Sequence, residues 1–322
     1  MSGAPMKIDA QLPTASPANG WIVLLGVLAV GLALPALVSG YYVSLGTQVL
    51  IFSLLAMSID IMAGYAGRTP LCHGAIFGVS TYAVLYGVSV AGFPLVTAIA
   101  LGIAAATCVA AIFALLAIRT SGVYFLLLTL ALGMIIWGIC LRWTRVTGGE
   151  NGIRGDIRPA FLGGNVPFYY AVLGLAAVLA VVMWRFVSSP FGMSLKGIRD
   201  SEGRMQSLGY NTNLHLFLGF TMSGFFAGVA GAAYALFNNF VSPSTVALTQ
   251  SVEGLLMAIV GGVGTLWGGL IGAAAIILLE NIVSTYTERW PTVLGLTFIF
   301  IMIFAPEGVL GKLRAVLTRF RN

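Results

Sequence analysis

Four ionisable residues, Asp60, His73, Glu253 and Glu280, lie inside or at the ends of long apolar runs. Such groups are costly in an apolar setting and often mark the pathway of a solute or ion, although they also cap helices or bond to neighbouring backbone. The two histidines share no ligand spacing and the three cysteines lie far apart, so we expect no metal site. The sequence has no Ser/His/Asp arrangement or Walker-type glycine loop. We therefore expect no enzyme activity and no cofactor bound by this chain itself.

Glycines near these residues recur at a spacing that lets two helix backbones approach closely. The pairs are Gly74 and Gly78, Gly224 and Gly228, and Gly268 and Gly272.

Two of the glycine-rich stretches resemble each other. Asp60 precedes Gly-Tyr-Ala-Gly at 64–67, and Glu253 precedes Gly-Gly-Val-Gly at 261–264; a close-packing pair follows each. This likeness hints at a duplicated unit, of the kind that transporters often use. The candidate pathway residues are Asp60, Gly64, Gly67, His73, Glu253, Gly261 and Gly264.

Membrane helices must position these residues, because 59% of the 322 residues are hydrophobic and only 8% are charged. A soluble domain carries about 25% charged residues, so a water-soluble catalytic domain is excluded. With about 20 apolar residues per crossing, the sequence predicts an all-α, polytopic transmembrane helical bundle of about ten spans, within a range of eight to ten. The predicted spans are 21–38, 43–63, 71–90, 93–118, 121–141, 166–184, 214–237, 245–263, 265–284 and 290–305.

Three of these runs, 71–90, 245–263 and 265–284, are the weakest because they combine an ionisable residue with many glycines. We expect that one or two of them form broken or re-entrant helices. A β-barrel is disfavoured, since its strands alternate between apolar and polar residues.

The distribution of positive charge predicts the orientation. Most lysines and arginines fall on the side that carries 1–20, 64–70, 119–120, 185–213, 264 and 306–322. The positive-inside rule places that side in the cytoplasm. We therefore predict a polar cytoplasmic tail at 1–20, a transmembrane domain at 21–311 and a basic cytoplasmic tail at 312–322. The net charge of +6 needs no nucleic-acid partner to explain it.

The long cytoplasmic loop 188–209 has the pattern of two short amphipathic helices. Ser189 can cap a helix that begins at Pro190, Asp200 or Ser201 can cap a second one, and Gly209 can end it. Apolar residues near one face are Leu195, Ile198, Met205 and Leu208. The loop is either a docking platform for a cytoplasmic partner or a solvated linker whose charges only fix topology.

The outward loop 142–158 is unusually charged for this protein, with glycines that allow tight turns. Charge on such a loop suits contact with a soluble partner, while a solvated face that binds nothing is an equal alternative. The candidate docking residues are Arg145, Glu150, Arg154, Asp156 and Arg158.

Over about residues 41–312 the sequence resembles ABC-transporter permeases of the LivM type, the high-affinity branched-chain amino acid uptake family. The stretches that carry the resemblance are 64–78, 147–152, 189–200, 261–268 and 304–311.

The resemblance implies the ABC importer permease fold in a bacterial inner membrane. It also implies a second, related permease, two cytoplasmic ATPases that bind ATP and Mg, and a solute-binding protein outside the membrane. It assigns loop 188–209 as the ATPase-coupling element. The residues expected to act there are Pro190, Phe191, Gly192, Lys196, Arg199, Asp200, Glu202 and Gly209.

The first glycine stretch departs from the family pattern. The family commonly has Gln-x-Ser-Leu-Gly-His after Gly-Tyr-Ala-Gly, where Arg68, Pro70 and Cys72 stand here. The expected solute is a branched-chain or related amino acid, with urea, amides and other carboxylates as alternatives. A rival of another class is an ion-coupled secondary transporter that uses Asp60, Glu253 or Glu280 as coupling groups.

Overall fold

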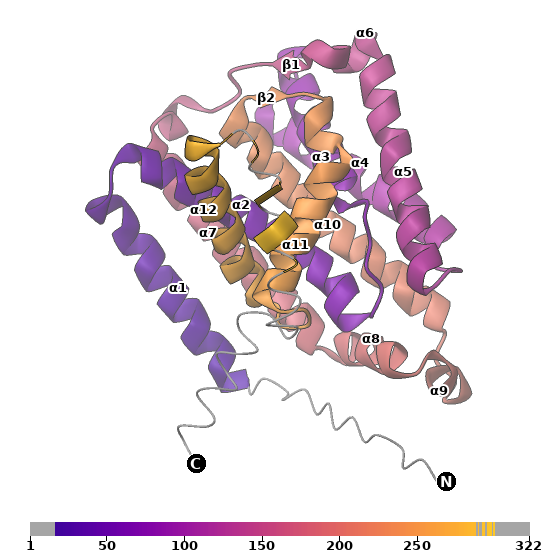
Figure 1. Ribbon diagram of the computed structural model, residues 1–322. Coiled ribbons are helices and arrows are strands. Elements are labelled where there is room, and N and C mark those ends of the chain that lie inside the picture. The colour runs from indigo at the N-terminus through magenta and orange to yellow at the C-terminus, as the bar shows by residue number, and fades with distance from the viewer. Residues whose placement is uncertain (1–16, 288, 290–291, 294, 298, 300–322) are drawn as a thin grey trace.

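The computed structural model describes residues 17–287, 289, 292–293, 295–297 and 299. Within them the chain forms a helical bundle with a small two-stranded ribbon at one end (Figure 1). The long helices are α1 (Pro17–Leu37), α2 (Gly40–Asp60), α3 (His73–Ser89), α4 (Leu95–Ala117), α5 (Gly122–Arg142), α7 (Asn165–Ser188), α10 (Thr212–Asn238), α11 (Leu248–Gly261) and α12 (Gly268–Tyr286). The short elements are η1 (Ile61–Tyr65, a π-helical turn), α6 (Thr144–Thr147), η2 (Gly149–Asn151), β1 (Ile153–Arg154), η3 (Ala160–Leu162), α8 (Pro190–Asp200), α9 (Glu202–Ser207), β2 (Phe240–Val241) and η4 (Pro243–Val246).

Six helices of the described part are long and apolar enough to cross a membrane. They are Gly40–Tyr65, Leu95–Ala117, Gly122–Arg142, Asn165–Ser188, Thr212–Asn238 and Gly268–Tyr286. The predicted helical class is confirmed, whereas the predicted count of ten spans is not. The last predicted span, 290–305, and the predicted tail 312–322 lie largely or wholly outside the described residues.

Of the two glycine-rich runs that lie outside these six helices, one forms a helix too short for a full crossing. The run at 71–90 gives α3 with 17 residues, and the run at 245–263 gives α11 with 14 residues. At about 1.5 Å per residue, α11 rises about 21 Å, less than the roughly 30 Å of a hydrocarbon core. The third weak run, 265–284, forms the full-length α12. At the N-terminus, α1 begins at Pro17, so the last residues of the predicted tail 1–20 belong to a helix.

Helix α2 lies at the centre of the bundle and packs against α7, α10, α11 and α12. Every residue of α2 from Leu50 to Asp60 is buried, and the buried run continues through η1. The glycine pairs form close helix contacts as predicted. A Cβ on Gly228 of α10 would lie 2.8 Å from the Cβ of Ala106 on α4, and one on Gly74 of α3 would lie 2.6 Å from the Ser251 nitrogen of α11.

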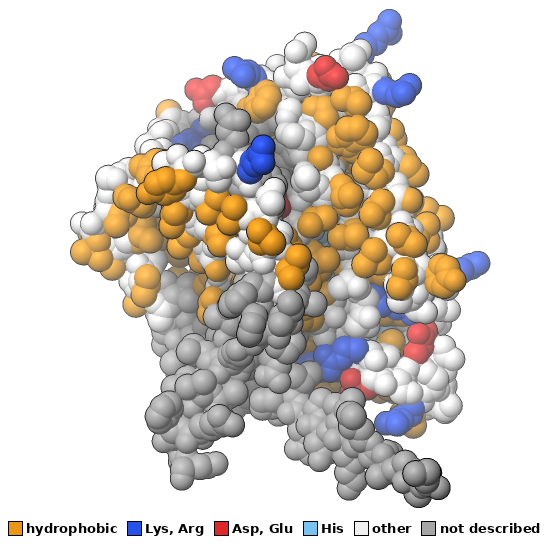
Figure 2. Space-filling view, in the orientation of Figure 1, with side chains coloured by type: hydrophobic (Ala, Val, Ile, Leu, Met, Phe, Trp, Pro, Cys, Tyr) orange, Lys and Arg blue, Asp and Glu red, His pale blue; other side chains and the backbone are white. Residues whose placement is uncertain are grey.

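Charged side chains gather at two ends of the molecule, with a largely hydrophobic surface between them (Figure 2). At one end, called the coupling end below, the connections 61–72, 118–121, 188–211 and 262–267 meet: Arg68 bonds to the Thr120 carbonyl and to Glu202. At the opposite end β1 pairs antiparallel with β2, with Ile153 opposite Val241. This grouping of the connections agrees with the predicted sidedness, and Figure 1 shows α8 and α9 at one end and α6, β1 and β2 at the other.

Candidate functional site

The predicted coupling loop folds into two capped helices, α8 and α9. The Ser189 hydroxyl accepts a hydrogen bond from the Gly192 nitrogen at 3.3 Å, and Pro190 is the first residue of α8. Of the two residues proposed to cap the second helix, it is Ser201 that accepts from the Arg204 nitrogen, at 3.4 Å. Gly209 adopts a φ of +87°, which lets the chain turn after α9. Local capping chemistry therefore sets the shape of this loop.

The apolar face of this loop packs on the bundle with one exception. Leu195, Ile198 and Met205 are buried together. Leu208 is 67% exposed, so the prediction that it lies on one face with the other three is wrong. The reason is that α9 ends at Ser207, which turns Leu208 away from the helix face. Leu208 thus joins Met193 as an exposed apolar side chain at the coupling end.

The other predicted coupling residues divide into an outer and an inner set. Pro190, Asp200 and Gly209 are exposed; Gly192 is buried; Phe191, Lys196, Arg199 and Glu202 are half-buried.

Two members of the inner set contact the bundle directly. The Lys196 ammonium lies 5.0 Å from the ring centroid of Tyr65 in η1. Burial lowers the pKa of Lys196, and the nearby Arg199 lowers it further, while Asp200 opposes the shift. Glu202 forms an ion pair with Arg68 at 3.0 Å.

The two look-alike glycine stretches meet at the coupling end. We call them the gate turns, residues 61–67 and 262–264. The Gly264 nitrogen donates to Oδ1 of Asp60 at 2.7 Å. A Cβ on Gly64 would collide with the Gly264 backbone and with Asp60, so only a glycine fits there.

Arg199 of α8 reaches into this contact. Its Nη1 donates to the Gly64 carbonyl oxygen at 2.6 Å, and its methylenes pack on Gly67, whose φ of +69° also favours glycine. The structure therefore places a residue predicted for coupling directly on Gly64 and Gly67, two of the residues predicted for the pathway, and beside the contact between Asp60 and Gly264.

The remaining pathway candidates lie elsewhere. His73 is buried, and its Nε2 is 2.6 Å from the Ser223 hydroxyl, which donates to the Ser58 carbonyl. Glu253 on α11 is partly buried, accepts from Gln250 at 3.4 Å and lies close enough to Glu280 of α12 for electrostatic repulsion.

Gly261 serves packing, because it touches the Gly268 backbone at the start of α12. Among the described residues, no three His, Cys, Asp or Glu side chains lie together as a metal site needs. Cys72 and Cys140 are buried, Cys108 is exposed, and all three are free thiols.

Arg68 is a residue of this site whose role the sequence did not reveal. Its Nη1 donates to the carbonyl oxygens of Ile118, at 3.0 Å, and Thr120, and its Nη2 to Glu202. It thereby ties the connection between α4 and α5 to α9. The sequence marked Arg68 only as a departure from the family pattern, since its partners lie about 50 and 134 positions away.

The outward loop offers fewer free charges than predicted. Arg145, Glu150, Arg154 and Asp156 are exposed. Arg158 instead donates to the carbonyl oxygens of Leu236, at 3.2 Å, and Phe237, at 2.9 Å, near the end of α10. Its guanidinium also lies 4.1 Å from the Phe168 ring centroid. Arg158 therefore satisfies terminal carbonyls of a helix, a role that its neighbours in the sequence did not indicate.

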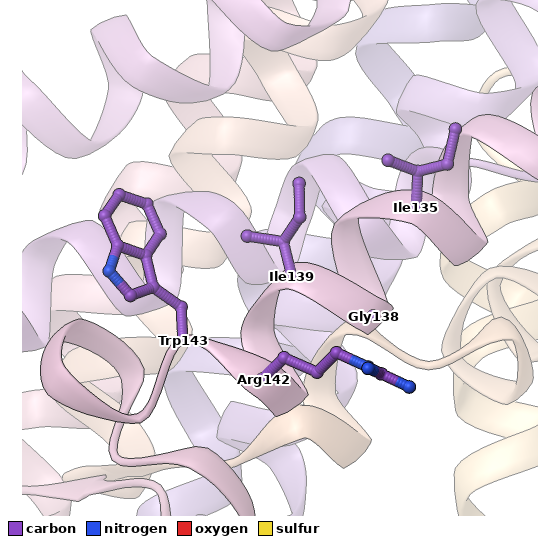
Figure 3. Close-up of a pocket in the computed structure, with 5 residues that line it drawn as sticks. All are labelled: Ile135, Gly138, Ile139, Arg142 and Trp143. Atoms are coloured by element: carbon purple, nitrogen blue, oxygen red, sulfur yellow. The ribbon is translucent and has the colours of Figure 1, made fainter.

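A shallow depression of about 470 Å³ lies on α5 at the same end. It is lined by Ile135, Gly138, Ile139, Arg142 and Trp143 (Figure 3). Most of these side chains are exposed apolar groups of a membrane helix, and the depression is at the end opposite the gate turns. It has no part in the contacts described above.

Comparison of the sequence with known proteins finds a matching protein family and several relatives. The family model for the permease component of branched-chain amino acid transport systems matches residues 41–306. The high-affinity branched-chain amino acid transport system permease protein LivM of Salmonella typhimurium is 25% identical over 91% of this chain and 75% of its own length. LivM of Escherichia coli is 27% identical over the same shares.

A relative with another printed solute also matches. The autoinducer 2 import system permease protein LsrC of Klebsiella pneumoniae is 27% identical over 58% of this chain and 54% of its own. No solved structure matches the chain.

Proposed function

This chain belongs to the family of permease components of branched-chain amino acid transport systems, and we propose that it carries a branched-chain or related amino acid into the cytoplasm. It is a multi-pass membrane protein and a transport subunit. The observation that carries the proposal is the match to LivM proteins over 91% of the chain. The preformed helices α8 and α9 support it, because an ATP-driven permease needs a surface on which its ATPases act.

The proposed partners follow from the same family. They are two cytoplasmic ATPases that bind ATP and Mg, a second related permease, and a solute-binding protein on the far side of the membrane. The exposed residues Met193 of α8, Arg204 of α9 and Leu208, which follows α9, offer a mixed apolar and charged surface to the ATPases. Closure of the ATPases would then move α8 and α9 against the bundle and change which side of the pathway is open.

The geometry of Arg68 bears on the choice of solute. If Arg68 lined the pathway, its charge would favour a solute unlike those of the LivM relatives. Its side chain instead joins the loop between α4 and α5 to α9. The departure from the family pattern therefore serves the structure of the coupling end. Because Arg68 does not act on the solute in this arrangement, we favour a branched-chain amino acid over urea, amides or other carboxylates.

The test is uptake by the purified complex in lipid vesicles. Leucine, isoleucine and valine, with urea and acetamide as comparisons, would be offered with the binding protein outside and ATP inside. We expect ATP-dependent uptake of a branched-chain amino acid. A matched complex whose ATPases cannot hydrolyse ATP is the control and should take up none.

Two outcomes would contradict the proposal. Uptake driven by a proton or sodium gradient without ATP would indicate the secondary transporter. ATP-dependent uptake of urea or acetamide alone would confirm the import mechanism and overturn the choice of solute.

A further inference from the structure

We propose that the gate turns form the gate of the pathway at the coupling end, and that Arg199 of α8 is the positioning residue that holds this gate closed. This inference rests on the proposed function, since it assumes that ATPases move α8. It adds a direct connection between the helix that the ATPases push and the backbone that closes the pathway.

The contact between the gate turns is made by backbone atoms. A Cβ on Gly64 would collide with the nitrogen of Gly264 and lie 2.6 Å from its Cα. Each turn also ends a helix: η1 ends at Tyr65, and α11 ends at Gly261 before Gly262, whose φ is +112°. Helix ends carry backbone groups with no partner inside the helix. Two such ends meeting across glycines form a joint that can close tightly and also separate.

Arg199 stabilises this joint from the side of α8. Its Nη1 to Gly64 carbonyl bond, at 2.6 Å, satisfies a carbonyl at the end of η1. The side-chain carbons of Arg199 also pack on Gly67 of the same turn, and a Cβ on Gly264 would lie 3.8 Å from the same nitrogen, so the guanidinium lies beside the contact between the two turns. Nε and Nη2 of Arg199 each donate to Oδ1 of Asp200 at 3.3 Å, which fixes the plane of the guanidinium. A planar group with several donors suits this geometry better than an ammonium does.

Asp60 supplies the second attraction. Its Oδ1 binds the Gly264 nitrogen, while its buried Oδ2 has no hydrogen-bond partner among the described residues. Arg199 lies close enough to act electrostatically on this carboxyl group. A buried carboxyl with an unused oxygen is costly unless a cation compensates it. Removing Arg199 from the joint therefore leaves both Gly64 and Asp60 poorly compensated, so the joint resists opening until α8 is moved.

The contacts of α8 link its movement to the movement of the first gate turn. Two cations three positions apart, Lys196 and Arg199, lie on the same segment, with Lys196 over the Tyr65 ring and Arg199 on Gly64 and Gly67. Residues three apart face the same side of a helix. A displacement of α8 consequently moves η1 and withdraws Arg199 from Gly64 in one motion.

The experiment measures solute molecules carried per ATP hydrolysed in the reconstituted complex, with leucine as the solute. Arg199→Gln removes the cation, and Arg199→Lys keeps the charge but not the planar guanidinium. Arg119→Gln, which removes an exposed cation from the connection between α4 and α5, is the matched control. A charged hydrogen bond is worth roughly 1.5–3 kcal/mol, so Arg199→Gln should lower the ratio by about tenfold or more. Arg199→Lys should recover part of it, and Arg119→Gln should leave it unchanged.

Amide hydrogen exchange shows whether the substitution loosens the gate turns. In Arg199→Gln the amides of 61–67 and 262–264 should exchange faster than in the wild type, and ATP hydrolysis without binding protein should rise. If exchange there is unchanged and Arg199→Gln gives the same transport ratio as the Arg119→Gln control, the inference is overturned.

A second variant covers the case in which Arg199→Gln does not assemble. Asp200 is exposed, with 66% of its side chain accessible, so Asp200→Asn should fold. Because it loosens the hold on the guanidinium, it should lower the ratio in the same direction, and a wild-type ratio would overturn the inference. Failure of the proposed function looks different, because the wild-type complex would then show no ATP-dependent uptake at all.

Discussion

Arg68 is only 7% exposed although it carries a permanent charge. Three acceptors surround it: the carbonyl oxygens of Ile118 and Thr120 and the carboxylate of Glu202. Its guanidinium also lies 5.8 Å from the Phe125 ring centroid. A buried cation of this kind stabilises a fold only because its partners are in place.

Replacing Arg68 by Gln should therefore destabilise the coupling end. The substitution leaves two carbonyl groups and Glu202 without their donor, at a cost of about 1–3 kcal/mol. We expect a lower melting temperature of the purified protein in detergent. Arg119→Gln is the matched control, because Arg119 is the neighbouring exposed cation on the same connection. Equal melting temperatures for the two variants would show that Arg68 is dispensable for stability.

At the residue scale, the features that could be predicted from the sequence are those formed by residues close together in the chain. The caps at Ser189 and Ser201 and the turn at Gly209 depend on bonds that span three residues or fewer, so their pattern is visible in the chain. The bond from Arg199 to Gly64 spans 135 positions. No periodicity connects two such segments, and for that reason the coupling and pathway residues were predicted as separate groups.

At the scale of elements, glycine decides how closely the helices pack. Gly224 and Gly228 of α10 face Ala110 and Ala106 of α4. The contact is tight enough that a larger side chain must push the two helices apart. The close-packing spacing in the sequence predicted this contact but not its partner, because the alanines of α4 form no distinctive pattern.

Gly228→Leu should prevent α4 and α10 from packing. Even a Cβ would lie 2.8 Å from the Ala106 Cβ, and overpacking of this kind costs about 1–3 kcal/mol or more. We expect little monodisperse protein on size-exclusion chromatography. Gly174→Leu on α7 is the control, because nothing lies within 4 Å of a Cβ there. If Gly228→Leu gave the same yield as Gly174→Leu, the close packing of these helices would not be needed for folding.

The length of α11 differs from its predicted span. Apolar residues continue beyond both ends of this helix, so hydropathy extends the predicted span to 245–263. The helix ends at Gly261, before Gly262, whose φ of +112° an α-helix does not allow. Hydropathy counts apolar residues, whereas a helix end depends on backbone geometry.

At the scale of the whole molecule, each end has some arginines that are bound by other parts of the chain and others that are exposed. At the coupling end, Arg68 and Arg199 are bound. At the opposite end Arg158 is bound, whereas Arg145 and Arg154 are exposed, with the Arg154 guanidinium 4.9 Å from the Phe240 ring centroid. The grouping of connections into two ends was predictable from the order of apolar runs, since each full crossing reverses the side.

Charge reversal of Arg145 and Arg154 together should weaken docking of the solute-binding protein. We expect a higher binding-protein concentration for half-maximal stimulation of ATP hydrolysis, with basal hydrolysis unchanged. The difference from the wild type should shrink as salt rises, because the screening length is about 8 Å at physiological ionic strength. Arg119→Glu, an exposed cation at the coupling end, is the control for net charge.

Arg158 is excluded from this reversal because it holds the end of α10, so its loss would confound docking with folding. An unchanged half-maximal concentration for the double variant at low salt would assign docking to another surface.

The backbone contact between Gly64 and Gly264 has a consequence for how such a protein can diversify. Peptide groups present the same N–H and C=O to every solute, so this backbone contact cannot distinguish one solute from another. Side chains elsewhere along the pathway, or in another chain, must then determine which solute is transported. Cargo preference and the closing device can consequently change independently, and a new specificity could evolve without rebuilding the joint.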